Sequence, residues 1–285
     1  MREKRKGECT MEKLGLQMYS FGEYDPSKVE IHLKTAKEMG FFGVELFGPN
    51  LMLPAQELKE LLEKYQLEAI SMHVQTDMVL DMITYAKALG MSFIGIGMEY
   101  LPDGDSAHAY AKRLNELGEV CHQNGMMLTY HNHTQEFMSV GEKRIVDILL
   151  ENTNPDFVSM ELDAGWCAAA GFDPIEFINQ YQTRVKLIHI KESKSVIGVQ
   201  PPMNPKDIKF DASGTPLFSE EEQARMKRSK EINCAAGQGL VNWKALKETA
   251  DHYGCRAYIV EREYSYSGER IECLQEDINY YKANM

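Results

Sequence analysis

The strongest constraint on the fold is an alternation of short apolar runs with helical segments that repeats eight times along the chain. The runs are apolar throughout, as expected of strands that are buried on both faces of a parallel sheet. Eight strand–helix units predict an α/β fold, a single-domain (β/α)8 barrel. The predicted strands cover residues 14–20, 42–47, 68–74, 92–98, 126–129, 157–162, 185–190 and 257–260, and the predicted helices cover residues 29–39, 56–65, 78–89, 107–124, 145–151, 173–181, 243–253 and 271–281.

Glycine residues close several of these helices just before the next strand. Gly40, Gly90, Gly125 and Gly254 each follow a helical segment, as a C-terminal cap residue does. A doubly wound open sheet, the main competitor, usually carries a glycine-rich phosphate loop after its first strand. Residues 17–22 contain no such GxGxxG pattern, so the barrel is the better interpretation. The length of 285 residues also suits a barrel, which typically needs about 250.

Two segments depart from the regular alternation. Residues 1–12 are polar and are expected to form a flexible leader, which leaves residues 13–285 for the barrel. Residues 192–238 lie between the seventh strand and its helix and are far longer than an ordinary connection. A long insertion on this face of a barrel is commonly a lid or an interface loop. The alternative is a mobile loop without a role.

The composition limits the classes of partner. The formal net charge is −12 and the pI about 5.2, which argues against nucleic acid and anionic membranes, since both attract basic surfaces. No apolar run reaches the roughly 18 residues of a membrane span, and the basic start has no apolar signal region behind it. The six cysteines show no CxxC spacing, so reduced thiols and a cytoplasmic location are expected.

The densest cluster of polar groups is Tyr130-His131-Asn132-His133-Thr134-Gln135-Glu136-Phe137, directly after the fifth predicted strand. Other strands end in the same way, and strand ends of one sense meet at a single mouth of a barrel. Carboxylates mixed with imidazole form a hard site that favours Mn²⁺, with Mg²⁺ and Co²⁺ as alternatives. The candidates are Glu45, His73, Glu136, Asp163, His189 and Glu261, with His131, His133, Glu161, Lys191 and Glu263 close by.

Several motifs together resemble those of the xylose isomerase-like TIM barrel family, the sugar phosphate isomerase/epimerase superfamily. The resemblance spans nearly the whole chain, and one departure is Gly237-Gln238-Gly239, where the family more often has Gly-Glu-Gly. In such enzymes a Glu, an Asp, a His and a second Glu hold one divalent ion. Carried across, the resemblance implies Glu136, Asp163, His189 and Glu261. The motifs are 130–137, 161–166, 189–192, 237–243 and 258–261.

The resemblance implies proton transfer next to a carbonyl. A metal ion would act as the Lewis acid, and Glu136 and Glu261, on opposite sides of the sugar, would remove and return the proton. Trp166 would form an apolar wall for the sugar ring, and Lys191 or His73 would bind its hydroxyl groups.

Several residues have alternative interpretations. His133 could lie nearer the metal than Glu136, because the strand has ended by that point. His131 could line the pocket or be a hydrogen-bonded core imidazole. Glu45 could contact substrate or form a buried ion pair with Lys191. Glu161 shares the strand phase of Asp163, as Glu263 shares that of Glu261, so both could point into the barrel beside the ligands.

The sequence therefore favours a metal-dependent sugar isomerase or epimerase. One alternative is a lyase of the same family, either an inosose-type dehydratase or a 3-keto-glycoside deglycosidase. A second is a non-catalytic sugar-binding or partner-subunit barrel. An apurinic endonuclease is disfavoured by the acidic charge. The expected partner is a small sugar or keto sugar, and the resemblance also admits a homo-oligomer.

Overall fold

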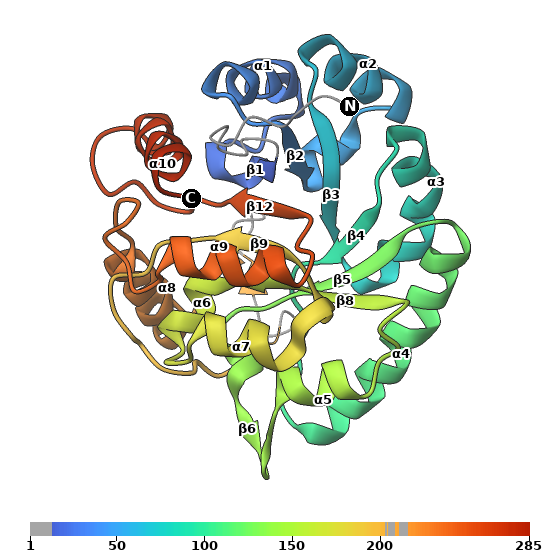
Figure 1. The fold of residues 1–285 in the computed structure, drawn as a ribbon, viewed down its shortest axis with the longest axis vertical. Helices are drawn as coiled ribbons and strands as arrows, with labels where there is room; N and C mark the ends of the chain where they lie inside the picture. Colours follow the sequence, from blue (N-terminus) through green and yellow to red (C-terminus); the bar gives the residue numbers. More distant parts are fainter. Residues whose placement is uncertain (1–12, 203, 205–208, 211–215) are drawn as a thin grey trace.

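Eight parallel strands close into a barrel in a computed structural model that describes residues 13–202, 204, 209–210 and 216–285 (Figure 1). Their order around the barrel is β1-β12-β9-β8-β5-β4-β3-β2, which confirms the predicted (β/α)8 architecture. The strands are β1 (Leu14–Gln17), β2 (Gly43–Leu46), β3 (Glu68–Val74), β4 (Phe93–Ile96), β5 (Met127–His131), β8 (Val158–Asp163), β9 (Val185–Ile190) and β12 (Ala257–Val260).

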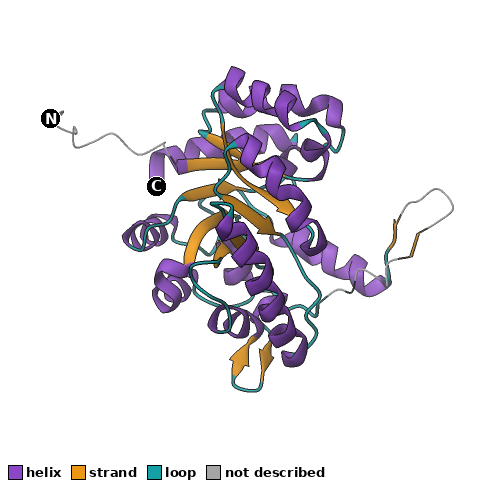
Figure 2. Ribbon diagram, turned by 90° about the vertical axis from the view of Figure 1, so that its right-hand side faces the viewer, coloured by secondary structure: helices purple, strands orange, loops and turns teal. Residues whose placement is uncertain are grey.

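Helices surround the barrel and cover the outer faces of its strands (Figure 2). Among the described helices, none is both long enough and apolar enough to cross a membrane. The helices are α1 (Val29–Met39), α2 (Ala55–Tyr65), α3 (Val79–Leu89), α4 (Gly104–Gln123), α5 (Ile145–Glu151), α6 (Ala164–Ala169), α7 (Pro174–Tyr181), α8 (Glu220–Ile232), α9 (Trp243–His252) and α10 (Arg270–Asn284).

Local signals set the ends of these helices. Gly40 and Gly90 adopt left-handed φ values of 90° and 73° after α1 and α3, which a residue with a Cβ rarely does. At the other end, Asp173 caps α7 by accepting a hydrogen bond from the Ile175 N–H, with Pro174 in the first turn. These caps explain why most predicted boundaries lie within one or two residues of the observed ones.

The insertion after β9 contains regular structure that the sequence pattern did not predict. Lys209–Phe210 (β10) and Pro216–Leu217 (β11) pair antiparallel, and α8 follows them. Ser219 begins α8 with a capping box to Glu222. The short helix α6 and the hairpin of β6 (Ser139–Val140) and β7 (Lys143–Arg144) were also not predicted. The predicted leader, residues 1–12, lies outside the described residues.

A small apolar cluster fills the inside of the barrel below the mouth. Its members come from four strands, and because side chains alternate along a strand, residues two positions further on point the same way. His189 therefore lies above Leu187, and Glu261 lies above Ile259. The cluster consists of Ile70, Phe93, Leu187, Ala257 and Ile259, all buried.

Candidate functional site

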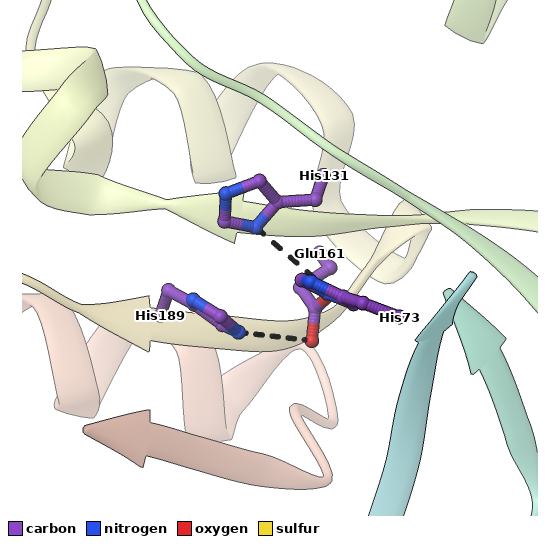
Figure 3. Close-up of side chains that lie close together, drawn as sticks. All are labelled: His73, His131, Glu161 and His189. Atoms are coloured by element: carbon purple, nitrogen blue, oxygen red, sulfur yellow. Dashed lines mark hydrogen bonds and ion pairs between the residues drawn. The ribbon is translucent and has the colours of Figure 1, made fainter. Parts of the chain in front are cut away.

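Two overlapping groups of side chains that could hold a metal ion lie at the C-terminal ends of the strands. The first is His131, Asp163, His189 and Glu261; one ligand atom from each lies within 4.8 Å of the others. The second is His73, His131, Glu161 and His189 (Figure 3). The two groups share two imidazoles, so they form one continuous polar layer.

Strand register explains why these residues meet. His131, the last residue of β5, pairs with Glu161 of β8, and Asp163, the last residue of β8, pairs with His189 of β9. Glu261 follows β12 directly, and its N–H donates to the Ile190 carbonyl at 3.1 Å. Neighbouring parallel strands thus place titratable groups side by side at one level of the barrel.

Asp163 is fully buried and only partly hydrogen-bonded. Its Oδ1 accepts a hydrogen bond from the Trp166 N–H at 2.7 Å, whereas Oδ2 has no partner. Asn132 holds the backbone here through two hydrogen bonds, to the Asp163 N–H and carbonyl. Burial raises the pKa of Asp163 to about 7. A buried carboxylate oxygen without a partner is costly unless a cation or proton satisfies it.

His131 presents a neutral imidazole to the same space. Its Nδ1 is buried without a hydrogen-bond partner, and its Nε2 lies 4.0 Å from Asp163 Oδ2. Burial, followed by the neighbouring His189 and His73, holds the pKa of His131 well below its ordinary value. A neutral imidazole is the form that binds metal ions.

His189 connects the site to the acids below it. Its Nδ1 lies 2.7 Å from Glu261 Oε2, and its Nε2 lies 2.7 Å from Glu45 Oε1. Burial opposes the charged ring, but Glu45 and Glu161 raise the pKa of His189 well above its ordinary value. Both nitrogens therefore donate hydrogen bonds when no metal is bound. Nδ1 is the nitrogen that a cation would contact, while Nε2 stays with Glu45.

Buried carboxylates support the ligands from beneath. Glu45 accepts hydrogen bonds from Gln17 at 2.7 Å and from Ser71. Glu161 contacts His73 at 2.6 Å through Oε2. Its Oε1 lies 3.5 Å from His189 Nε2 (Figure 3). Such second carboxylates orient metal-binding imidazoles and make them more basic. Glu161 therefore lies where its strand phase predicted.

Lys191 lies between two acids and an aromatic ring. Its Nζ is 2.6 Å from Glu263 and 3.4 Å from Glu261, and it sits 4.7 Å from the centre of the Trp166 ring. Of the two interpretations of Glu45, the ion pair with Lys191 is not formed, because Lys191 contacts Glu261 and Glu263 while Glu45 contacts Gln17 and His189. Trp166 and Lys191 do lie together at the mouth, as their expected contacts with one sugar require.

Glu136 lies outside both groups of potential ligands. It is buried in the turn after β5, where Oε1 accepts from Tyr130 Oη at 3.0 Å and from Gln135 at 3.1 Å. Its Oε2 accepts from the His133 N–H at 2.7 Å. The carboxylate therefore shapes the turn, and His131, rather than Glu136, is grouped with Asp163, His189 and Glu261. The strand phase, which puts His131 inward with Thr129, was the overlooked signal.

The donor set fits a divalent cation. Two imidazoles and two carboxylates converge, and Asp163 Oδ2, which has no hydrogen-bond partner, lies 4.0 Å from His131 Nε2. Mixed oxygen and nitrogen donors of this kind are common ligands of divalent metal ions in proteins.

Two cavities open over these residues. The larger has a volume of about 1100 Å³, and His73, His131, His133 and Glu261 are in its lining. The smaller, about 310 Å³, lies between the mouth and α8 and is lined by His133 and Trp166, among others. The ligand groups are therefore accessible from a space large enough for a small molecule.

Comparison with known proteins agrees with the fold. The xylose isomerase-like TIM barrel family matches residues 33–284. The chain belongs to this family, which confirms the resemblance seen in the motifs.

Individual relatives are more distant. An inosose dehydratase from Lacticaseibacillus casei is 36% identical over 90 residues, which cover 31% of this chain and only 29% of that protein. A sugar phosphate isomerase/epimerase from Parabacteroides distasonis ATCC 8503 has a TM-score of 0.71 at 21% identity, with 99% of this chain and 97% of the other covered. The IolI protein with a bound zinc atom gives 0.67 at 14% identity, with 95% and 96% covered. At these identities the two structures show the fold.

Proposed function

We propose that the protein is a metal-dependent enzyme that removes a proton next to the carbonyl of a sugar. The observation that carries this proposal is the group of His131, Asp163, His189 and Glu261 at the barrel mouth, in which the buried Asp163 Oδ2 has no hydrogen-bond partner. The sugar-related names of its relatives support a sugar as the substrate class.

The metal ion, Glu261 and Lys191 would have different roles in this reaction. Mn²⁺ is the favoured ion, with Mg²⁺ and Co²⁺ as alternatives, and when bound it would polarise the carbonyl and stabilise negative charge on its oxygen. Glu261 borders the larger cavity, and Lys191 and His189 hold its pKa well below the ordinary value against the effect of burial. It is therefore ionised and can accept the proton. Lys191 is placed to bind a hydroxyl group beside Trp166.

One observation favours elimination or isomerisation over a two-base epimerisation. Inversion of a carbon centre by two opposed bases needs a second carboxylate, and Glu136, the expected partner of Glu261, faces Tyr130 and the His133 N–H. A single base with a nearby acid is enough for a lyase, such as an inosose-type dehydratase or a 3-keto-glycoside deglycosidase. The inosose dehydratase relatives are consistent with that second candidate.

Exchange of a substrate proton with deuterated water tests the chemistry. Metal-loaded wild-type protein should catalyse exchange of the C–H next to the carbonyl in at least one of a panel of keto sugars. Glu261→Gln should abolish this exchange, whereas Glu263→Gln, a matched change two residues on, should keep the metal. Exchange at the wild-type rate in E261Q, or unchanged exchange after complete metal removal, would show that the mechanism is wrong.

We also propose that the insertion 192–238 closes over the bound sugar. Its residues Gln200, Phe218 and Met226 form the smaller cavity together with Trp166. A deletion of residues 195–230 should change the range of sugars that the protein accepts and leave its metal content unaltered, since the deleted stretch contains no candidate ligand. Metal loss in this variant would contradict the assignment.

A further inference from the structure

The larger cavity has an apolar arm that the proposed proton transfer does not need. One end of the cavity is lined by His131 and Glu261. The rest extends over the ends of β2, β3 and β4, away from the ligands of β8, β9 and β12. Its apolar lining residues are Phe47, Leu51, Met52, Val74, Met78, Met82 and Met98.

Three methionines of this arm are unusually exposed for apolar side chains. Met52 is 72% exposed, Met78 41% and Met98 38%. They come from three separate connections, so the chain brings them together only in the fold. Exposed apolar side chains gathered around a cavity commonly mark a binding site, and methionine adapts to ligands of different shape.

An aromatic group borders the same arm. The rings of Tyr19, Tyr24 and Phe47 pack edge to face, with centroids 5.7 to 5.9 Å apart. These contacts fix the Phe47 ring, which lines the cavity. The arm thus combines a rigid aromatic wall with flexible methionines.

Some of the polar groups in the arm are already engaged with one another. Thr76 Oγ1 contacts both Glu99 Oε2 and Tyr110 Oη at 2.6 Å. Glu99 Oε1 accepts from the Tyr100 N–H at 3.1 Å. Gln75, Asp77 and Arg113 also line the cavity, so the arm offers a ligand some polar contacts beside its methionines and Phe47.

The cavity is larger than a single sugar ring requires. At about 1100 Å³ it exceeds the roughly 300–1,000 Å³ typical of pockets for drug-sized ligands. A single sugar ring is smaller than such a ligand and would leave the methionine end empty.

We propose that the substrate is a sugar derivative with an apolar substituent, which this arm binds. This inference rests on the proposed function for the sugar end. The keto sugar lies at Glu261, and the substituent lies against Phe47, Met52 and Met78. The cavity is continuous between the two ends, so one molecule spans both. The arm then selects substituted sugars over free ones.

A neutral apolar dye tests the arm without turnover. N-phenyl-1-naphthylamine should bind metal-loaded wild-type protein with increased fluorescence. The double variant M52Q/M78Q should bind it at least tenfold more weakly, which corresponds to about 1.4 kcal/mol. Leu80→Gln is the matched control, because Leu80 is 44% exposed near Met78 but does not line the cavity. All these side chains are exposed, so the variants should fold, and circular dichroism checks this.

A sugar-bearing pair extends the test. Octyl glucoside, below its micelle concentration, should displace the dye at a concentration at least tenfold lower than methyl glucoside does. That preference should disappear in M52Q/M78Q and persist in L80Q. Equal dye binding by wild type and M52Q/M78Q, or equal displacement by the two glucosides, would overturn the proposal.

Two further outcomes separate the possible failures. Dye binding that depends on Met52 and Met78, without any proton exchange on keto sugars, would refute the proposed chemistry and leave the apolar arm as a binding site. Light scattering tests whether a second copy of the chain covers this apolar surface instead. A wild-type dimer that M52Q/M78Q converts to monomer would show that a second copy covers the arm, and the substrate inference would be wrong.

Discussion

Glu136, in the turn after β5, and His131, the last residue of β5, are alternative metal ligands, and one variant of each separates them. Glu136→Gln keeps the shape of the side chain. Its amide oxygen can still accept from Tyr130 and Gln135, but its NH₂ group would face the His133 N–H, where Oε2 now accepts at 2.7 Å. One buried hydrogen bond is lost and two donors are left facing each other, which costs about 1–3 kcal/mol.

In a domain of this size that loss should lower the melting temperature by roughly 2–8 °C. Metal content should stay at the wild-type level, because Glu136 belongs to neither group of potential ligands. His131→Gln should do the reverse. Loss of a direct ligand should weaken metal binding by more than roughly 100-fold, since even supporting residues are worth about 10–100-fold.

Elemental analysis of both purified variants, with thermal unfolding in chelator followed by circular dichroism, measures these effects. The chelator removes the contribution of the metal, so the melting temperatures report the protein contacts alone. An E136Q variant that loses its metal, together with an H131Q variant that retains it, would refute the assignment made from the structure.

Three other perturbations have outcomes that the contacts define. Glu45→Gln weakens the hydrogen bond to His189 Nε2 and should lower metal affinity about 10–100-fold in a calorimetric titration. Metal removal should lower the melting temperature, by the equivalent of about 2.7 kcal/mol when free metal stands at 100 times its dissociation constant. Asp147 accepts from Arg144 and Tyr181; burial opposes ionisation, but these partners lower its pKa, so its stabilising effect is complete at neutral pH and is lost on acidification. Asp147→Asn should therefore cost about 1–3 kcal/mol in urea unfolding at pH 7 and much less near pH 3.

Much of the fold could be predicted because it depends on local signals. The alternation of apolar runs with glycine-capped helices specified all eight strands, and β3, β9 and β12 have the predicted ends. The helix of the insertion, α8, was missed because it is polar on nearly all sides and shows no apolar periodicity. Its start was nevertheless visible in the Ser219 to Glu222 capping box.

The site was harder to predict, because it depends on which way a side chain points. Asp163, His189 and Glu261 were predicted to lie together because a charge at the end of an apolar strand is conspicuous, and the structure groups them. The choice between His131 and Glu136 needed the exact end of β5, and the strand continues to His131. Five residues later the chain has turned, and Glu136 faces Tyr130. The motif alone does not reveal this turn, so it could not show which way the Glu136 side chain points.

The most direct test of the account is the position of a bound metal. A crystal structure of Mn²⁺-loaded protein, with anomalous scattering to locate the ion, should place about one ion per chain between His131, Asp163, His189 and Glu261. Supporting contacts from His189 Nε2 to Glu45 should remain. An ion bound by Glu136 instead, or a protein that takes up no divalent metal, would contradict the central claim.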